Sequence, residues 1–239
     1  MEHQVHVPTV QSIMKLFDSA TYRVDRSKLL SDVFECGAIA ISNTVDLKQA
    51  EEREKRYLQI INQYSKEEQE LITKIFGEIF ALCSSCTHPL GSFGDWLGEL
   101  FMQSNTSSDK AGQFFTPYSV SRASAKIAIN AELVERYKES GEILSISEPA
   151  CGSGGMIIAA LETLWVEHNF NYATRCFVEA SDIDSRCVHM CYLQLSLAGV
   201  PAIIKHQDAL SRKMWSVWYT PAYLFQFPKF REFKKVAYM

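Results

Sequence analysis

The chain has 239 residues, 47% of them hydrophobic, and a formal net charge of −4. This length can bury one good core, or a catalytic-type domain with a helical appendage. The negative charge excludes a broad basic surface for duplex DNA, because duplex affinity depends largely on neutralising phosphates. Any DNA contact must therefore be local or supplied by a partner.

The sequence also bears on the compartment. No apolar run approaches the roughly 20 residues that a membrane span needs, and the first residues lack the basic-then-apolar pattern of a signal peptide. The seven cysteines are an odd number without a disulfide framework, as in proteins of a reducing compartment. We expect a cytoplasmic protein with no membrane partner.

The N-terminal part of the chain has the patterning of helices. Apolar side chains recur at helical spacing in residues 10–17 and 29–39. Residues 46–64 follow as a charged helical segment, on which Glu52 and Arg56 are spaced to pair at i,i+4.

The strongest predicted helix begins at Ser65, where Ser-Lys-Glu-Glu is a capping-box pattern, and its apolar stripe continues to Phe80. This stripe is a packing surface, on its own domain or on another chain. We predict a helical N-terminal region over residues 1–110.

From Thr116 onward the pattern alternates between helices and short apolar strands, which indicates a parallel α/β architecture. We predict an α/β domain over residues 111–239, with its strands at 143–147, 175–180, 202–205 and 216–219.

The most informative stretch is Glu-Pro-Ala-Cys-Gly-Ser-Gly-Gly at residues 148–155. It follows the first predicted strand and opens a helical pattern. Glycines let the backbone turn sharply and let a ligand approach closely, and the free N–H groups of a helix start offer donors. An acid, a tight glycine turn and a helix start together indicate a nucleotide-like cofactor site.

The order of acid before glycines resembles the first motif of S-adenosylmethionine (SAM) dependent methyltransferases, in the DPACGSGG form of the DNA adenine-N6 enzymes. Upstream, Gly-Gln-Phe-Phe-Thr-Pro at residues 112–117 resembles the GQF(F/Y)TP motif of type I restriction-modification methylase subunits. Residues 95–101 are similar to the short helix that precedes that motif. The resemblance covers about half of the chain, and it implies a Rossmann-like fold that binds SAM. From the residues alone, Thr116 and Pro117 are also a helix N-cap and first turn.

Three acids follow the first three predicted strands, where ligands bind in doubly wound sheets. Singly, each is more often a helix cap or turn former. The resemblance implies that Glu148 contacts the methionine part of SAM, that Asp182 accepts the ribose hydroxyls, and that Asp208 lies near the adenine amino group. The full set of expected cofactor-binding residues is Phe115, Thr116, Pro117, Glu148, Ala150, Gly152, Gly154, Asp182, Ile183, Asp208 and Ala209.

The expected catalytic segment departs from the family pattern. The family uses (Asp/Asn/Ser)-Pro-Pro-(Tyr/Phe) after its fourth strand to hold a flipped adenine, and this chain has Thr220-Pro221-Ala222-Tyr223 instead. On this comparison Thr220 and the Pro221 carbonyl would orient the amine, and Tyr223 would stack on the base. Threonine lacks the reach of Asn or Asp, so the site is degenerate. The alternative is a simple turn after a strand.

A complete methyltransferase sheet needs three more strands and a target-recognition region, so either these are absent or another polypeptide completes them. The chain is also too short for a full type I subunit.

Two other segments have residue types that can bind metal or DNA. The thiols of Cys83 and Cys86 lie close to His88 in sequence, but with no second ligand pair nearby we expect structural cysteines and no metal site. The most basic local segment is at the C-terminus, either a DNA contact or a solvated tail: Lys229, Arg231, Lys234 and Lys235.

The sequence therefore favours an enzyme that methylates DNA adenine at N6 with SAM as cofactor, in a restriction-modification or mobile-element setting. Its partners would be DNA, with help from a partner protein or specificity subunit, and further copies or other chains in a homo- or hetero-oligomer. The alternative is a catalytically inactive relative that acts as a binding module. A third hypothesis that the cofactor motifs allow is a methyltransferase that acts on RNA or protein.

Overall fold

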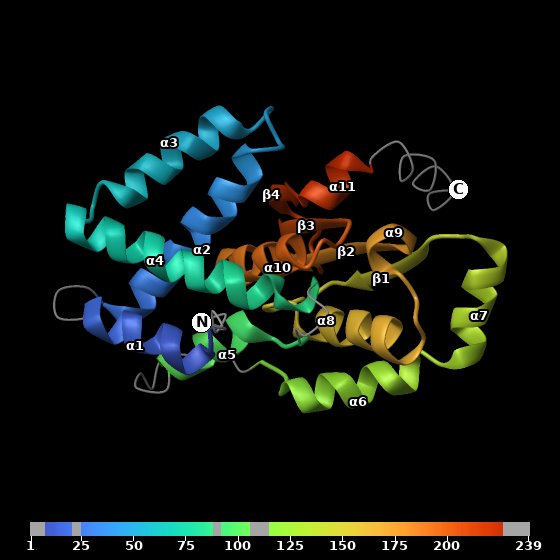
Figure 1. The fold of residues 1–239 in the computed structure, drawn as a ribbon. Coiled ribbons are helices and arrows are strands. Elements are labelled where there is room, and N and C mark those ends of the chain that lie inside the picture. Colours follow the sequence, from blue (N-terminus) through green and yellow to red (C-terminus); the bar gives the residue numbers. More distant parts are fainter. Residues whose placement is uncertain (1–7, 21–24, 88–91, 106–114, 227–239) are drawn as a thin grey trace, which may run out of the picture.

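The computed structural model describes residues 8–20, 25–87, 92–105 and 115–226 (Figure 1). Within these ranges the chain is an α/β structure with a four-stranded sheet and helices packed on both faces. The predicted basic C-terminal residues and the first half of the GQFFTP motif, residues 112–114, lie outside the described residues. Among the described helices, none is both long and apolar enough to cross a membrane.

The predicted helices of the N-terminal region are confirmed, and the capping box at Ser65 is present. The Glu68 carboxylate accepts from the Ser65 N–H at 2.7 Å, and the Ser65 hydroxyl accepts from the Glu68 N–H at 3.3 Å. The elements are α1 Val10–Ala20, α2 Arg26–Asn43, α3 Ala50–Ile61, α4 Lys66–Cys83, η1 Ser84–Thr87 and α5 Trp96–Asn105.

The expected pair between Glu52 and Arg56 is wrong. Arg56 reaches across to α2 and bonds Glu35, with Nε 2.6 Å from Oε1. A bidentate Arg–carboxylate geometry between two helices is more favourable than a single contact along one helix surface.

The sheet has the strand order β1-β2-β3-β4. Its strands are β1 Leu144–Glu148, β2 Cys176–Asp182, β3 Ala202–Gln207 and β4 Met214–Tyr219, close to the predicted positions. The first three are parallel, but β4 runs antiparallel to β3. The all-parallel expectation is wrong for β4, because the link 208–213 is far shorter than the dozen or more residues that a parallel crossover needs.

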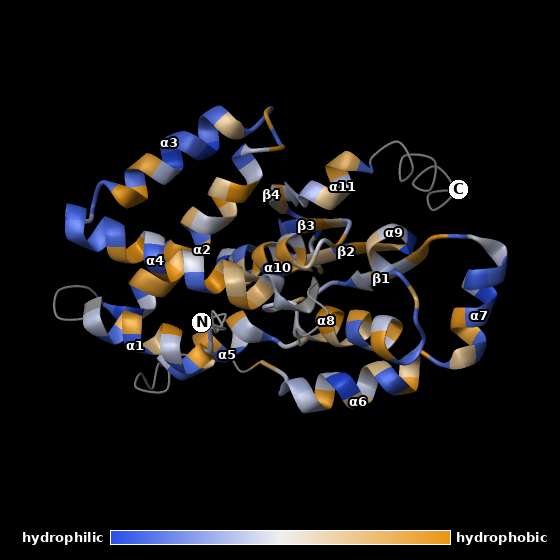
Figure 2. Cartoon of the chain, viewed as in Figure 1, coloured by the Kyte–Doolittle hydropathy of each residue, from blue (hydrophilic) through white to orange (hydrophobic). Residues whose placement is uncertain are grey.

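In Figure 1, α8 and α10 lie on one side of the sheet, and α9 and α11 on the other. Figure 2 shows hydrophilic stretches at the outward parts of α3 and α7, while apolar positions of α2 and α10 gather toward the centre. The remaining elements are α6 Tyr118–Ala128, α7 Ala131–Ser140, α8 Gly155–Glu162, the π turn η2 Thr163–Glu167, α9 Tyr172–Arg175, α10 Ser185–Leu197 and α11 Pro221–Phe225.

Helix α10 is buried between the sheet and α2, and nine of its residues are buried. This placement explains Cys187 and Cys191, which are 1% and 0% exposed and serve as small core residues. One contiguous core cluster joins side chains of α1, α2 and α4 to those of α8, α10 and the strands. The helical N-terminal part therefore folds against the sheet and shares its core.

Arg53 on α3 anchors this contact. Its side chain is 8% exposed and pairs with Asp46, equally buried, at 3.1 Å. Its second nitrogen donates to the Val217 carbonyl on β4 at 2.8 Å, and the guanidinium lies 4.0 Å from the Trp218 ring centroid. A third donor contact goes to Ser42. Because β4 is an edge strand, Arg53 also occupies a carbonyl that would otherwise be open to pairing.

We expect Arg53→Ala to lower the free energy of unfolding by about 3–5 kcal/mol, because it leaves the Asp46 carboxylate buried without its partner. Lys55→Ala on the same helix is the control. Lys55 forms an ion pair with Glu51 in which both side chains are exposed, so its loss should cost no more than about 0.5 kcal/mol. Chemical denaturation measures both. Equal effects would contradict the anchoring role of Arg53.

Candidate functional site at the carboxyl edge of the sheet

The glycine turn after β1 has a conformation that ordinary side chains resist. Gly152 has φ +52 and Gly154 has φ +99, in the left-handed region that favours glycine. The Gly154 N–H donates to the Cys151 carbonyl at 2.8 Å, and the Cys151 N–H donates to the Ser181 carbonyl of β2 at 2.9 Å. The turn is thus pinned to the neighbouring strand, and α8 begins directly after it.

Asp182 fastens the turn from the end of β2. Its Oδ2 accepts from the Gly152 N–H at 2.9 Å, and its Oδ1 accepts from the Asp184 N–H at 2.9 Å. The residue is 9% exposed. Asp184 in turn caps α10 by accepting from the Arg186 N–H at 2.9 Å. The structure therefore brings Asp182 and the glycine turn into direct contact, and it fixes the acid on two backbone donors.

Asp95 holds the glycine turn in place from the segment just before α5. Its carboxylate accepts from the Ser153 hydroxyl at 2.6 Å, from the Gln194 amide at 2.9 Å and from the Gly98 N–H at 3.1 Å. Burial raises the pKa of Asp95, and these three hydrogen bonds oppose that shift. The Gln194 amide also donates to the Ser153 carbonyl at 2.8 Å. One buried carboxylate thus joins the start of α5, the glycine turn and α10.

Two glycines make room for this carboxylate. A Cβ on Gly98 would lie 2.3 Å from Asp95 Oδ2, and a Cβ on Gly155 would lie 2.6 Å from the same atom. Neither distance is sterically possible without displacing the acid. Sequence reasoning did not single out this acid, although the short helix expected over residues 95–101 included it.

Phe115 covers the other side of the turn. A Cβ on Gly152 would lie 3.1 Å from its ring carbons, and the ring is 5.4 Å from that of Phe101 on α5. The predicted helix start is displaced by one residue, because α6 begins at Tyr118 with Pro117 as its N-cap and no side-chain cap bond. Thr116 therefore does not cap this helix. Thr116 and Pro117 are both exposed.

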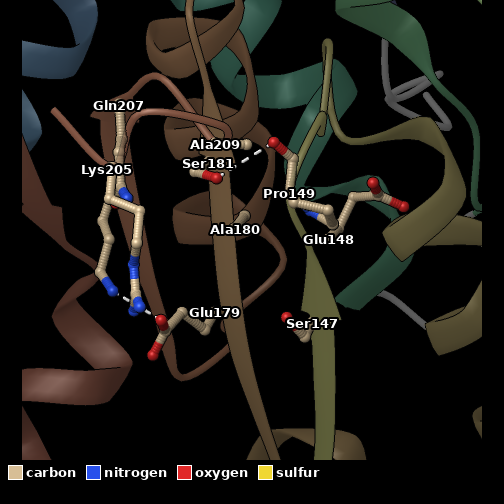
Figure 3. Close-up of a pocket in the computed structure, with 10 residues that line it drawn as sticks. Ser147, Glu148, Pro149, Glu179, Ala180, Ser181, Lys205, Gln207 and Ala209 are labelled. Atoms are coloured by element: carbon tan, nitrogen blue, oxygen red, sulfur yellow. Dashed lines mark hydrogen bonds and ion pairs between the residues drawn. The ribbon is translucent and has the colours of Figure 1, made fainter. Parts of the chain in front are cut away.

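Glu148 lies at the end of β1 and bonds the Ala150 N–H at 3.2 Å. It borders a cavity of ≈ 390 Å³ at the carboxyl edge of the strands (Figure 3). Figure 3 shows the Lys205 side chain directed toward Glu179, and this ion pair measures 2.5 Å. The cavity is polar, and its lining includes Pro149, Ala180, Ser181, Gln207, Ala209 and Arg212. Gly152 and Asp182 lie at the same edge but do not line it.

Asp208 follows β3, as predicted, and its oxygens are occupied by the turn that it starts. They accept from the Leu210 N–H at 2.9 Å and from the Ser211 hydroxyl at 2.7 Å. These hydrogen bonds, that of Ser211 first, lower the pKa of Asp208. The turn-forming role weighed for this acid is present, and Ala209 beside it lines the cavity. Ile183, after Asp182, is 63% exposed at the same edge.

The catalytic segment predicted at residues 220–223 lies at the opposite end of the sheet. Because β4 is antiparallel, Thr220 sits beside the start of β3, where its hydroxyl donates to the Val200 carbonyl at 2.7 Å and accepts from the Ala202 N–H at 2.9 Å. Ala202, beside Thr220, is four residues along β3 from His206, which corresponds to ~13 Å. Thr220 is fully buried.

The same segment is a helix start. Thr220 is the N-cap of α11, and its hydroxyl accepts from the Tyr223 N–H at 3.3 Å, with Pro221 in the first turn. Tyr223 is 3% exposed and packs against Phe177. The placement of Thr220, Pro221 and Tyr223 contradicts a shared site with Glu148 and Asp182 and fits the alternative of a turn after a strand. Sequence order alone could not show this, because it does not give strand direction.

The thiol of Cys151 lies within the turn and is 5% exposed. A hydrogen bond with Cys191, together with burial, raises the pKa of Cys151 well above its usual value. A protonated, buried thiol is a poor nucleophile. Among the residues that the structure describes, no group of His, Cys, Asp or Glu is arranged to hold a metal ion.

The comparisons with known proteins bear on this geometry. A family model described as N-6 DNA methylase matches residues 91–232, which include α5, the glycine turn and all four strands. The chain belongs to the N-6 DNA methylase family. Among curated proteins, no match was found. Family membership supports the predicted α/β methyltransferase fold.

Two solved structures are similar to this N-6 DNA methylase-family chain. One is a putative class I SAM-dependent methyltransferase from Listeria monocytogenes, which is 14% identical with a TM-score of 0.45. The alignment covers 93% of this chain and 69% of the Listeria chain. The other is a type I restriction-modification methyltransferase subunit from Streptococcus thermophilus, 16% identical with a TM-score of 0.43. It covers 87% of this chain, which spans 40% of that subunit's length.

The packing of Asp95 against Gly155 predicts opposite effects for two glycine-to-alanine changes. Gly155→Ala should destabilise the fold by about 1–3 kcal/mol, because the new methyl group overlaps the buried carboxylate. Gly77→Ala in α4 is the control. Nothing lies within 4 Å of its Cβ position, so the helix should gain about 0.5–1 kcal/mol. Urea denaturation measures both, and a neutral Gly155→Ala would show that the turn is not held as described.

Proposed function

We propose that this chain binds SAM at the carboxyl edge of its sheet and serves in adenine-N6 methylation of DNA in a restriction-modification setting. The observation that carries the proposal is the glycine turn held between Asp182 and Phe115, beside Glu148. The family description supports the reaction and the DNA substrate. The thiols of Cys36, Cys151, Cys176 and Cys191 are buried and not oxidised to disulfides, which supports the cytoplasm as the compartment.

The residues present fit this cofactor. A Cβ at Gly152 would lie 3.1 Å from the Phe115 ring, so the glycine lets this ring pack directly on the turn. Each oxygen of Asp182 accepts one backbone N–H, and a carboxylate oxygen has lone pairs for more than one donor. Asp182 can thus also accept ribose hydroxyls, and Glu148 can attract the cationic amine of the methionine part. When bound, SAM supplies an electrophilic methyl group on a sulfonium.

The other residues of the proposed site would contribute packing contacts to the cofactor. Ile183 offers an exposed apolar surface on which an adenine ring could pack, and Ala209 lines the adjoining cavity. Ala150, Gly154, Thr116 and Pro117 would form the walls around the turn. We assign Asp208 the role of shaping the loop after β3, because its hydrogen bonds go to that loop.

The groups that hold the target adenine would come from elsewhere in the assembly. Thr220 is buried at the far end of the sheet. Strand β1 pairs only with β2 among the described strands, which leaves its other edge for additional sheet. We propose that a partner polypeptide, such as a specificity or second modification subunit, supplies the base-binding acceptors.

The buried position of Thr220 also favours a second function, that of a SAM-binding but catalytically silent relative which acts through a partner. The two functions share the cofactor site and differ in methyl transfer. Tritium from labelled SAM appearing on unmethylated DNA in the presence of the purified chain would establish the enzyme. SAM binding without transfer, with candidate partner subunits added, would establish the silent module.

Calorimetric titration with SAM tests the proposed site. We expect Asp182→Asn to weaken SAM binding by at least about tenfold, because it removes a charged acceptor. Glu142→Gln is the control, since Glu142 is exposed just before the opposite end of β1 and should bind as the unsubstituted chain does. Thermal unfolding of each variant separates lost affinity from lost fold. No binding by the well-folded chain, or equal binding by both variants, would contradict the proposed site.

A further inference from the structure

The hairpin between β3 and β4 carries an exposed ring and two exposed cations. It is closed by hydrogen bonds from the Asp208 N–H to the Lys213 carbonyl at 2.9 Å and from the Arg212 N–H to the Asp208 carbonyl at 2.8 Å. Arg212 has φ +60, so the backbone reverses sharply there. We call the group formed by the half-buried His206 and the exposed Arg212, Lys213 and Trp215 the hairpin surface.

The ring of Trp215 is the centre of this surface. It is 46% exposed, and its centroid lies 4.6 Å from that of His206 with an interplanar angle of 35°. The Lys213 ammonium is 5.5 Å from the ring centroid. A partly exposed indole, supported on one side by an imidazole and accompanied by a cation, offers a stacking platform for a planar ligand.

The cations of the hairpin surface are available to a ligand. Arg212 and Lys213 are both exposed, and neither forms an ion pair within the described ranges of the chain. The nearest acid along the hairpin, Asp208, has its carboxylate engaged by Leu210 and Ser211. Two adjacent cations without acidic partners are complementary to phosphate groups.

The hairpin surface adjoins the proposed cofactor site. A ring nitrogen of His206, Nε2, lies 3.1 Å from the carbonyl of Ile183, next to Asp182. Arg212 lines the cavity that Glu148 borders. A strand of nucleic acid on this surface would therefore pass close to the edge at which the methyl donor is proposed to bind.

We propose that the hairpin surface binds a single strand of DNA, with phosphates on Arg212 and Lys213 and a base stacked on Trp215. The choice of DNA rests on the proposed function, and the inference adds the surface that contacts it. Leu210 and Met214 beside it are 96% and 54% exposed, an apolar flank that a protein partner could also use. Arg212 and Lys213, which have no acidic partner among the residues that the structure describes, favour nucleic acid over protein.

Fluorescence anisotropy with a labelled, unmethylated single-stranded oligonucleotide of 20 nucleotides tests this inference on the full chain. We expect Trp215→Ala to weaken binding by about tenfold or more, through loss of base stacking. Trp165→Ala is the matched control, because Trp165 on η2 is also 46% exposed; it should leave DNA binding unchanged.

The cations are tested through salt dependence. The double variant Arg212→Gln/Lys213→Gln should reduce the slope of log K against log salt by about 1.4, or 0.7 for each lost single-strand phosphate contact. The control changes two exposed lysines of α4, as Lys66→Gln/Lys74→Gln, with the same change in net charge and no expected change in slope.

SAM calorimetry on the same variants separates the two proposals. Variants that lose DNA and keep SAM support the hairpin surface. DNA binding that depends on Trp215 in a chain that binds no SAM would support the surface and count against the proposed function. The inference is overturned if the chain binds SAM and no DNA, if Trp215→Ala binds DNA normally, or if the surface binds only a protein partner.

Discussion

The buried Asp95 carboxylate is the constraint on which the glycine turn of the proposed cofactor site depends. It collects donors from the start of α5, from the glycine turn and from α10, and each such donor left buried without an acceptor would cost about 1–3 kcal/mol. Gly98 and Gly155 are the two positions where a side chain would meet this acid. Two factors thus set the conformation of the glycine turn: the left-handed backbone angles of its own glycines, and the Asp95 carboxylate packed against it.

The remaining features of the site follow from this support. The turn that Asp95 fixes presents the Gly152 N–H to Asp182 and packs against the Phe115 ring. Groups already held in place lower the free-energy cost of ordering the protein when a ligand binds. Asp95 also links the turn to the N-terminal helices, because it precedes α5 and α5 packs against α2. A partner that moves α5 would act on the turn through one hydrogen-bonded group.

Sequence patterns gave the helices, the strand positions and the glycine turn, because each depends on local periodicity or on backbone freedom. They failed where the outcome depends on pairing in space. The direction of β4 follows from a short hairpin, and it moves Thr220 to the far end of the sheet. Arg56 pairs with Glu35 on another helix, and Asp95 hydrogen-bonds to Ser153 of the turn from a segment distant in sequence. Local spacing contains no information on such contacts.

A crystal structure of the chain with S-adenosylhomocysteine would test the central claim most directly, since this product shares the ribose and adenine of SAM. The account predicts density for the ligand at the carboxyl edge, with its ribose hydroxyls on Asp182 and its amino-acid part beside Glu148 and Gly152, and an unchanged Asp95 network beneath. Density in the groove between α6 and the outer edge of β1, which Ile146 and Met156 line, would contradict it, as would a structure in which the ligand does not bind.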